Sequence, residues 1–488
     1  MQGPLMIQGT MSGAGKSLIC AGLCRILKNQ GVRVAPFKAQ NMALNSAVTK
    51  EGLEIGRAQA MQAECCKLKP SVLMNPVLLK PTSDKKSQVI VNGKVFGQMD
   101  AKEYYKWKKN LIPYVTESYE KISSMYDVII IEGAGSPAEI NLRDNDFVNM
   151  GMAAIAKSPV ILVGDIDRGG VFAQLAGTIS LLTSEEQKLI HGLIINKFRG
   201  DISILQSGIS MIEKITGKNV IGTLPYFSLN IDDEDSLSLP VENSALNLAE
   251  EGKGKVDIAI IGLPHISNFT DFDIFYQTGG ALIRYVRSVA TLGRPDMIII
   301  PGSKNTLADL AWLKASGLFA MIKSYANAGG ILVGICGGFQ MLGKEISDEA
   351  CLEGGGKAEG LNLLPFTTDF KAEKKLSLSS GTFSSMQGFF SCLETLSYSG
   401  YEIHQGESEG NVLFSKENIF GTYIHGIFDE ENIAAIIVEN IAKQKKIETG
   451  PLCRMSRHSL KEVAYDKLAG ILEQNIDMKK IYSLLGAR

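Results

Sequence analysis

Residues 9–17 read GTMSGAGKS, and their types and spacing suit the binding of nucleotide phosphates. Gly13 and Gly15 let the backbone approach a phosphate closely, with successive amide groups pointing toward it. Lys16 is placed to reach the terminal phosphates, and the Ser17 hydroxyl is placed to bind Mg²⁺. The stretch therefore predicts a site for a nucleotide and its metal ion.

The surroundings of this loop support the same interpretation. A strand-like segment, PLMIQG, precedes it, and a helix-like segment, SLICAGLCRILKNQG, follows it. We expect the helix to begin near Lys16, so that its positive N-terminal end faces the phosphates. The alternative, a glycine-rich turn with an incidental lysine, would not require a strand before the loop and a helix after it. The loop departs from the usual pattern because Thr10 stands where the first glycine is normally found.

Polar residues also end later strand-like segments. Glu132 closes an apolar run and precedes Gly-Ala-Gly-Ser, so its carboxylate is a candidate ligand of Mg²⁺ or of its water shell. Arg168 follows the next run, where it would contact phosphate or a substrate carboxylate, or form a structural ion pair. Asn196 ends a third run, where we expect it to contact the nucleotide base.

Cys336 lies within GICGGFQML, between a strand-like and a helix-like segment. A cysteine on such a turn, flanked by glycines, projects its sulfur outward as the serine of a nucleophile elbow does. The N-terminus of the following helix favours the thiolate. Cys336 is therefore the predicted nucleophile, in preference to a buried structural cysteine.

A thiol nucleophile of this kind needs a base, and the chain has five histidines. His404 and His425 both end strand-like runs, so the residues alone leave both open as the base. His265 is a candidate contact of substrate or of an interface. A structural role is expected for His191 and a solvated position for His458.

Six short, nearly continuous apolar runs rich in Val and Ile position these residues. Such runs are typical of buried parallel strands, and helical patterns lie between them, which predicts an α/β fold with two parallel-sheet domains. Ligand sites gather at the carboxyl ends of such strands, where the candidate residues lie. The runs are 127–133, 159–165, 193–197, 257–264, 296–302 and 331–338.

Domain boundaries are predicted from a change in composition. Residues 231–254 are polar and acidic, and a new strand begins at Val256, so this segment is predicted to be a linker. It separates a nucleotide-binding domain, residues 1–230, from a second α/β domain, residues 255–445. Residues 446–488 are predicted to form a C-terminal helical tail.

The charge balance argues against a nucleic-acid or membrane surface. The formal net charge is −2, from 50 basic and 52 acidic residues. YYKWKKN (104–110) is predicted to be the exposed face of a helix. No apolar run approaches the roughly 18 residues of a membrane helix, and the N-terminus lacks signal-peptide features.

The eight cysteines show no metal-binding spacing. Cys20 and Cys24 lie one helical turn apart and Cys65 and Cys66 are adjacent, so both pairs are predicted to be core residues. This usage favours a reducing cytoplasm. The oligomeric state is left open.

Seven stretches of the N-terminal half resemble the cobyric acid synthase family, and the likeness continues through nearly the whole chain. The first domain is similar to dethiobiotin synthetase, a P-loop fold whose superfamily has Thr in place of the first loop glycine. The second resembles class I glutamine amidotransferases of the triad type. The stretches are GTMSGAGKS, PFKAQNMALNS (36–46), EIGRAQAMQAE (54–64), MNPVLLKP (74–81), EGAGSPAEINL (132–142), DIDRGGVFA (165–173) and NKFRGD (196–201).

For the nucleotide site, the resemblance implies ATP and Mg²⁺, with a carboxylate as the phosphoryl acceptor. Ser17 and Glu132 are the implied metal contacts. The implied ATP contacts are Thr10, Lys16, Ser17 and Lys38.

For the thiol site, the resemblance selects His425 as the base. His404 is then either a family-specific residue near the site or a structural one. Most triad glutaminases have a glutamate two residues after the histidine, but this chain has Ile427, so the third member is left unnamed. PGSKNTL matches the place of the oxyanion donors, which implies the backbone amides of Ser303 and Gly337.

The implied reaction is ATP-dependent amidation with glutamine as the ammonia donor. The implied substrate is a corrin, adenosylcobyrinic acid a,c-diamide, amidated at its b, d, e and g carboxylates. Asn41 stands where relatives place an acidic metal ligand, and it is grouped with the substrate candidates. An ordinary amphipathic helix explains residues 54–64 equally well. The candidate substrate contacts are Asn41, Asn45, Arg57, Gln59, Arg168 and His404.

Two alternative functions remain in view. Cobyrinic acid a,c-diamide synthase shares the two-domain chemistry but differs from KAQNMALNS. Partitioning-type ATPase switches carry a second lysine early in the loop, where this chain has Thr10 and Met11, and they have no fused glutaminase.

Overall fold

The computed structural model describes residues 1–43, 45–81, 86–229, 231, 254–353 and 355–486. They form two compact units. Unit 1 comprises Met1–Asp235 and Lys461–Arg488, and unit 2 comprises Ser236–Leu460. The predicted linker lies outside the described residues, apart from Ile231 and Gly254. Each unit contains a largely parallel sheet covered by helices, so the predicted α/β fold class is confirmed.

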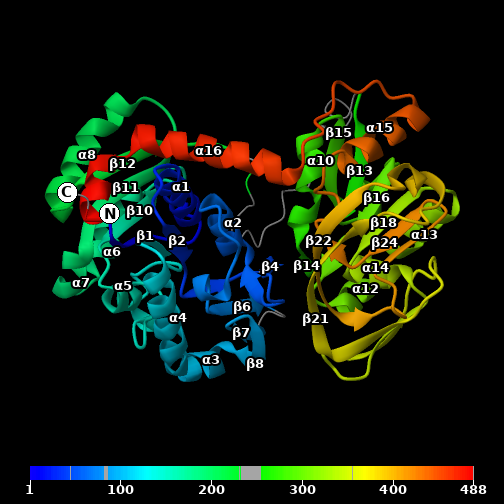
Figure 1. Ribbon diagram of the computed structural model, residues 1–488, viewed down its shortest axis with the longest axis horizontal. Coiled ribbons are helices and arrows are strands. Elements are labelled where there is room, and N and C mark those ends of the chain that lie inside the picture. The colour runs from blue at the N-terminus through cyan, green and yellow to red at the C-terminus, as the bar shows by residue number, and fades with distance from the viewer. Residues whose placement is uncertain (44, 82–85, 230, 232–253, 354, 487–488) are drawn as a thin grey trace. The chain divides into compact units, whose positions relative to one another are not determined.

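Unit 1 is built on a six-stranded sheet in which all neighbouring strands are parallel (Figure 1). The predicted apolar runs of this half are three of its strands. Because all six strands run the same way, the phosphate loop and the polar residues that end the strands share one edge. The order is β12 (Val220–Pro225), β11 (Ile190–Phe198), β10 (Val160–Asp165), β1 (Gly3–Gly9), β9 (Val128–Glu132) and β2 (Val34–Phe37).

Two apolar clusters cover the two faces of this sheet. Successive side chains of a strand point to opposite faces, so Leu5 and Ile7 of β1 join one cluster and Met6 joins the other. The cluster around Leu5 includes the four cysteines predicted to be core residues, all of them buried. The helices of this half are α1 (Lys16–Asn29), α2 (Arg57–Cys65), α4 (Ile112–Met125), α5 (Met150–Ala156), α6 (Val171–Ser180), α7 (Ser184–Leu189) and α8 (Ile202–Thr216).

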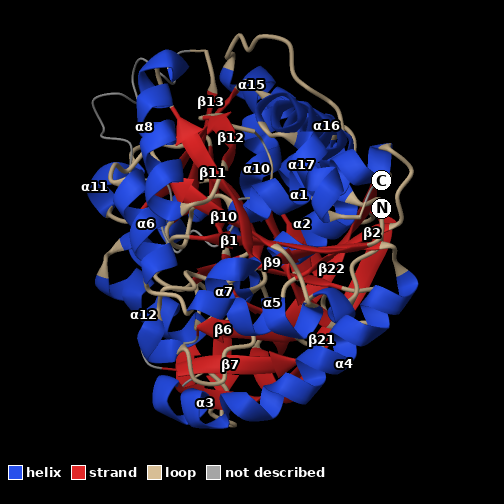
Figure 2. Ribbon diagram, turned by 90° about the vertical axis from the view of Figure 1, so that its left-hand side faces the viewer, coloured by secondary structure: helices blue, strands red, loops and turns tan. Residues whose placement is uncertain are grey.

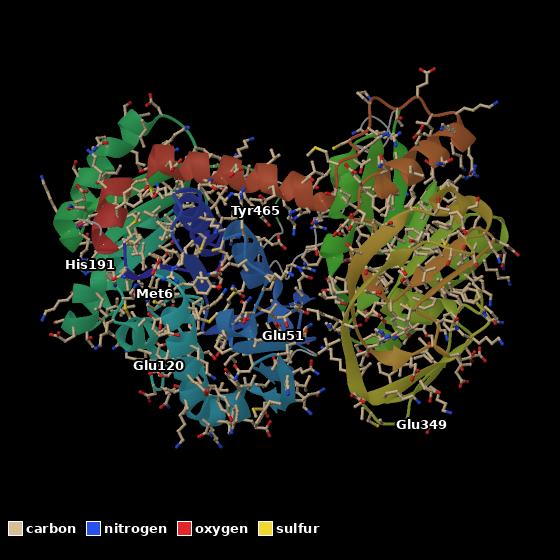
Figure 3. All side chains as sticks on the ribbon, in the orientation of Figure 1. Met6, Glu51, Glu120, His191, Glu349 and Tyr465 are labelled. Atoms are coloured by element: carbon tan, nitrogen blue, oxygen red, sulfur yellow. The ribbon has the colours of Figure 1, made fainter. Side chains whose placement is uncertain are left out.

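The segment predicted as a C-terminal tail contains α16 (Arg457–Asn475) and α17 (Met478–Leu484), and its residues from Lys461 onward belong to unit 1. They pack on α1, where a Cβ on Gly22 would lie 2.6 Å from Leu472. Tyr465, labelled in Figure 3, is buried, and its hydroxyl donates to Glu64 Oε2 at 2.6 Å. Apolar packing therefore makes this end of the chain part of the unit 1 core.

Unit 1 also contains a smaller four-stranded sheet next to α3 (Ala101–Trp107); β6, β7 and α3 are labelled in Figure 2. Two short strands, β4 (Ser46–Val48) and β5 (Glu54–Gly56), form a separate pair, and the 3-10 turns η1 (Val72–Met74), η2 (Lys108–Leu111) and η3 (Ile140–Leu142) complete this region. The order of the small sheet is β3 (Gln40–Met42), β6 (Val77–Pro81), β7 (Lys86–Val91) and β8 (Lys94–Asp100).

A buried ion pair ties the small sheet to the β4–β5 pair. Lys80 Nζ lies 2.5 Å from Glu54 Oε1, each side chain is 1% exposed, and Ser46 Oγ donates to the same carboxylate. Replacing Lys80 with alanine should lower the free energy of unfolding by about 3 to 5 kcal/mol, because the Glu54 carboxylate would stay buried after losing the Lys80 ammonium group. Urea denaturation measures this loss.

The double replacement Lys80→Met with Glu54→Leu is the matched control. It removes both charges and keeps apolar bulk, so it should recover most of the lost stability. If the single variant were as stable as the unaltered protein, the pair would not contribute as described.

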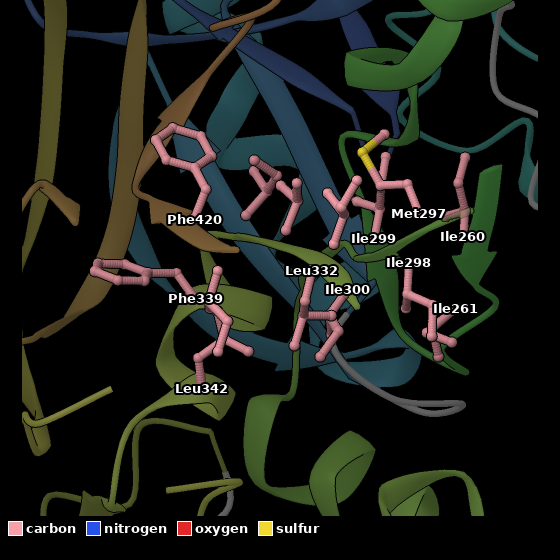
Figure 4. Packing of buried hydrophobic residues seen from close by; sticks show 14 of the residues in the cluster. Ile260, Ile261, Met297, Ile298, Ile299, Ile300, Leu332, Phe339, Leu342 and Phe420 are labelled. Atoms are coloured by element: carbon pink, nitrogen blue, oxygen red, sulfur yellow. The ribbon is translucent and has the colours of Figure 1, made fainter. Parts of the chain in front are cut away.

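Unit 2 has a six-stranded sheet in which only the β23–β24 pairing is antiparallel. Its centre is strongly apolar: Figure 4 shows Met297 to Ile300 of one strand beside residues of its neighbours. The three runs predicted for this half form three of its strands. The order is β15 (Ala281–Val286), β13 (Val256–Ile261), β16 (Met297–Ile300), β18 (Ile331–Ile335), β24 (Ile419–Thr422) and β23 (Leu413–Lys416).

A second sheet of unit 2 carries the predicted histidines. Its strands are β20 (Gly356–Glu359), β19 (Glu345–Asp348), β21 (Thr368–Thr382), β22 (Ser397–Glu407) and β25 (Ile424–His425), and β14 (Ile266–Ser267) pairs with β17 (Gly302–Ser303). The remaining elements are η4 (Phe269–Phe272), α10 (Asp273–Thr278), α11 (Val289–Leu292), α12 (Thr306–Ala315), α13 (Leu318–Asn327), α14 (Gly337–Leu342), η5 (Gly388–Leu393) and α15 (Ile433–Lys445). None of the helices in the described ranges has the length and apolarity needed to span a membrane.

Candidate active sites

The glycine-rich loop of unit 1 connects β1 to α1 and depends on glycine at two places. Gly13 and Gly15 have φ of 73° and 94°, in the left-handed region that side chains disfavour. Asn196 Nδ2 donates to Ala14 O at 2.8 Å, and a Cβ on Gly15 would lie 2.1 Å from that nitrogen. Asn196 thus holds the loop backbone, a contact different from the predicted one with a base.

Lys16 is the first residue of α1, as predicted, and its side chain folds back over the loop. Its Nζ donates to Met11 O at 3.1 Å and to Gly135 O at 3.3 Å, and the residue is 4% exposed. The ammonium group therefore lies between the loop and the segment that follows β9. A positive charge and helix amides at one point are the features that bind phosphate oxygens.

Glu132 is the centre of a buried polar network beside Lys16. Its Oε1 accepts hydrogen bonds from Ser17 Oγ and from Lys38 Nζ, both at 2.6 Å. Its Oε2 accepts from Gln62 Nε2 at 2.5 Å. Ser17 and Glu132 are adjacent oxygen donors of the kind that Mg²⁺ takes, so this donor set fits the metal ion.

Gln62 is a site residue that sequence reasoning missed. It lies on α2 one turn after Gln59, within the stretch that carried the family resemblance. Its position one helical turn after Gln59 was the only sequence signal for this role, because its partner Glu132 lies 70 residues away along the chain.

Other polar residues at this edge lie around the loop. Thr10 Oγ1 donates to Gln174 Oε1 at 3.0 Å. Lys197 Nζ donates to Gly13 O at 2.7 Å and forms an ion pair with Asp165 at 2.8 Å. Arg168 is exposed in the turn that follows β10.

The predicted substrate contacts of the two N-terminal stretches form one cluster. Asn41 Nδ2 donates to Gln59 Oε1 at 2.9 Å, and both residues are buried. The backbone N–H of Arg57 donates to Asn45 O at 3.3 Å. Within the described residues, Asn45 Oδ1 and Gln59 Nε2 are buried without a hydrogen-bond partner. These atoms retain unused hydrogen-bonding capacity.

In unit 2, Cys336 occupies a sharp turn between β18 and α14. Its φ and ψ are 51° and −109°, a strained conformation for a residue with a side chain. Two residues later, position 338 requires glycine, because a Cβ on Gly338 would lie 2.0 Å from Ile300 O. Cys336 Sγ lies 3.7 Å from Ile403 O and the residue is 6% exposed. This is the elbow geometry predicted from the glycines.

His425 is fully buried, and Asp271 holds it. Its Nδ1 lies 2.7 Å from Asp271 Oδ2, and its Nε2 lies 3.2 Å from Asn268 Nδ2. Burial alone lowers the pKa of His425, but the Asp271 carboxylate and the Cys336 sulfur outweigh burial and raise that pKa to about 9. Cysteine, histidine and carboxylate therefore interact as a set.

Asp271 occupies the role that was left unnamed in the sequence. It lies in HISNFTDFD, after β13, and reaches the histidine from 154 positions earlier in the chain. Its other oxygen accepts from the Gly426 backbone at 3.1 Å. Ile427, in the place of the usual glutamate, is a buried core residue.

The predicted oxyanion donors lie next to each other. A Cβ on Gly337 would lie 2.9 Å from Ser303 N, so the two backbones are in close contact. Asp309 supports this segment by accepting from Ser303 Oγ at 2.6 Å and contacting His265 Nδ1 at 2.8 Å. His265 is thus a support for the Ser303 strand.

His404 lies near the cysteine but its ring nitrogens contact other groups. Nδ1 lies 2.7 Å from Gly406 O and Nε2 lies 3.2 Å from Glu402 Oε2. The ring stacks on Tyr423 with centroids 3.8 Å apart. His425, which contacts Asp271 and interacts with Cys336, therefore has the contacts expected of the base. His404 is held by Gly406, Glu402 and Tyr423 and lines the site.

Asp271→Asn is expected to shift the pH dependence of glutamine hydrolysis. The raised pKa keeps His425 protonated up to about pH 9, so kcat/KM for glutamine should fall only as the pH rises through that value. Without the carboxylate the histidine loses its proton at lower pH, so the alkaline limb should move toward neutrality and the rate should drop. The pH profile of glutamate release measures both effects.

The matched control is Asp273→Asn, two residues further along, where the carboxylate pairs with Arg457 at 2.7 Å. That variant should keep the original alkaline limb. An alkaline limb that stays in place in Asp271→Asn would contradict the assigned role.

Known proteins are similar to both halves of this chain. Residues 5–239 match the family model of the CobQ/CobB/MinD/ParA nucleotide binding domain, and residues 257–433 match that of the CobB/CobQ-like glutamine amidotransferase domain. The chain is 49% identical to the cobyric acid synthase of Lachnoclostridium phytofermentans, over 99% of this chain and 98% of that protein. It is 47% identical to that of Ruminiclostridium cellulolyticum, over 99% and 97%. At this identity over both full lengths, the chain belongs to the cobyric acid synthase family.

Proposed function

We propose that the chain converts carboxylates of a corrin into primary amides, using ATP to activate each carboxylate and glutamine to supply the nitrogen. The observation that carries this proposal is that one chain holds two complete chemical centres. One is a cationic phosphate loop beside Glu132, and the other is the Cys336–His425–Asp271 set. Family membership supports the choice of a corrin as the acceptor.

In unit 2, the Cys336 thiolate attacks the side-chain carbonyl carbon of glutamine. The backbone amides of Ser303 and Gly337 donate to the oxyanion that develops. His425 gives its proton to the departing nitrogen, so ammonia leaves and a thioester remains. Water then attacks the thioester, with His425 taking the proton, and glutamate leaves as the thiol is regenerated.

The proposed glutamine pocket is a hollow of about 570 Å³ that begins at His404 and Tyr423. His404 and Tyr423 line it near the cysteine, and Lys371, Glu373 and Lys374 line it further out. The α-amino and α-carboxylate groups of glutamine carry opposite charges. Side chains of both signs therefore suit this ligand.

In unit 1, a carboxylate oxygen of the substrate attacks the γ-phosphorus of ATP, and the bond to ADP breaks. Lys16 and the N-terminal amides of α1 stabilise the charge on the phosphoryl oxygens. Mg²⁺ held by Ser17, and by Glu132 directly or through water, would supply further positive charge there. Ammonia then attacks the acyl carbon of the acyl phosphate, and phosphate leaves.

The proposed substrate is adenosylcobyrinic acid a,c-diamide, amidated at its b, d, e and g carboxylates to give adenosylcobyric acid. Each amide would consume one ATP and one glutamine. The proposed ATP contacts are Thr10, Gly13, Gly15, Lys16, Ser17, Lys38 and Asn196.

Mass spectrometry of the corrin product tests this function. With glutamine, ATP and Mg²⁺, the expected product carries four new amide groups, and glutamate and ADP accumulate together. Omitting the corrin acid should suppress ADP formation. Amidation of the a and c carboxylates of cobyrinic acid would instead identify a diamide synthase, and ADP formation without any amide would contradict the proposal.

A further inference from the structure

The small sheet of unit 1 and α3 line an open cavity of about 420 Å³. Its lining is mainly apolar and aromatic, and includes Met42, Tyr104, Tyr105 and Leu142. We propose that this cavity binds one edge of the corrin substrate, with Lys108 receiving a peripheral carboxylate. This inference rests on the proposed function, and it assigns the corrin a location in the molecule.

Two segments of the chain connect walls of the cavity to residues of the nucleotide site. Gln40 lines it only two residues after Lys38, whose ammonium group binds Glu132. Leu142 lines it from the segment that begins at Gly135, whose carbonyl accepts from Lys16. The same two segments thus contribute both to the cavity and to the nucleotide site.

Helix α3 is hydrogen-bonded to both of these segments. The Tyr104 hydroxyl donates to Gln40 Oε1 at 2.5 Å, and the Tyr105 hydroxyl donates to Asn141 O at 3.3 Å. The two tyrosines thus tie α3 to both segments. A rigid cavity suits successive amidations of one large ligand, because each carboxylate must be brought to the same phosphorus atom.

The rim of the cavity is apolar and open to a ligand. Met42 is 50% exposed and Leu142 is 41% exposed, on opposite segments. Ile140, in the same turn as Leu142, is 55% exposed. Exposed apolar side chains around a hollow are typical of binding sites, and the flat, largely apolar ring of a corrin suits this surface.

Lys108 supplies the charge complement. It lines the cavity, is 7% exposed, and its ammonium group lies 5.1 Å from the centroid of the Phe147 ring. Asp100 is the acidic residue that lines the cavity. Its carboxylate caps α3 by accepting hydrogen bonds from Lys102 N and Glu103 N, so it is engaged within the protein. A cation that lines a mainly apolar cavity favours a ligand that combines an apolar body with carboxylates.

Equilibrium dialysis of the corrin acid against the full chain tests the assignment, with the visible absorbance of the corrin as the readout. Leu142→Glu places a carboxylate on the apolar rim, and Lys108→Gln removes the cation assigned to the peripheral carboxylate, with Lys86 the other lining lysine. Each should raise the Kd of the corrin acid by about tenfold or more. The KM for ATP and the hydrolysis of glutamine should stay unchanged, which also shows that the variants are folded.

Matched controls carry the same replacements elsewhere in unit 1. Ile204→Glu alters an exposed apolar residue of α8 outside the cavity, and Lys109→Gln alters the exposed neighbour of Lys108. Both should bind the corrin acid as the unaltered protein does. If the unaltered protein amidates the corrin but the cavity variants bind it equally well, the cavity assignment is overturned alone. If the unaltered protein neither binds nor amidates the corrin, the proposed function falls together with it.

Discussion

Cys336→Ala should abolish amidation with glutamine, by about 10³-fold or more, while amidation with added ammonia continues at a rate near that of the unaltered protein. The reason is that the sulfur is the group that attacks glutamine, whereas the carboxylate is activated at the phosphate loop. Alanine is smaller than cysteine and fits the turn, so the surrounding fold should persist. Amide formation is measured with glutamine and with an ammonium salt in parallel.

Cys351→Ala is the matched control, since Cys351 is an exposed free cysteine of the same unit. It should leave both nitrogen sources usable. Loss of the ammonia-dependent reaction in Cys336→Ala would count against separate roles for the two centres.

Lys16→Ala should remove ATP turnover with either nitrogen source, by about 10³-fold or more. Its ammonium group is held beside the loop by Met11 O and Gly135 O, and alanine removes that positive charge. Glutamine hydrolysis belongs to the other centre and should persist. ADP release and glutamate release, followed in one reaction, separate the two effects.

Lys121→Ala, at an exposed position on α4, controls for the loss of a lysine. It should turn over ATP normally. ATP turnover near the normal rate in Lys16→Ala would rule out the assigned role of the phosphate loop.

The parts of the two centres that the sequence predicted are the ones whose chemistry is local. A glycine loop between a strand and a helix, and a cysteine between glycines, occupy a few consecutive residues whose backbone conformation follows from their types. The apolar runs predicted the two parallel sheets for the same reason. A strand that is buried on both faces is apolar along nearly its whole length, so each strand can be recognised from its own sequence.

The parts that the sequence did not predict join residues far apart in the chain. Asp271 reaches His425 across 154 positions and Gln62 reaches Glu132 across 70, and only the fold brings them together. The usual local signal, a glutamate after the histidine, is replaced here by Ile427.

The stretch at 104–110 was predicted to be the exposed face of a helix, and this prediction was wrong for Lys108. Charged residues are mostly exposed, so the pattern of the stretch alone favours the surface. In the structure Lys108 is 7% exposed and faces a cavity formed by strands that lie earlier in the chain.

An isotope-transfer experiment tests the central claim most directly. Corrin acid with ¹⁸O in its carboxylates is amidated with glutamine and ATP, and the released phosphate is analysed by mass spectrometry. An acyl phosphate intermediate predicts one ¹⁸O atom in the phosphate for each amide formed, because the carboxylate oxygen leaves with the phosphoryl group. Phosphate free of ¹⁸O, with amide still formed, would contradict activation of the carboxylate by ATP.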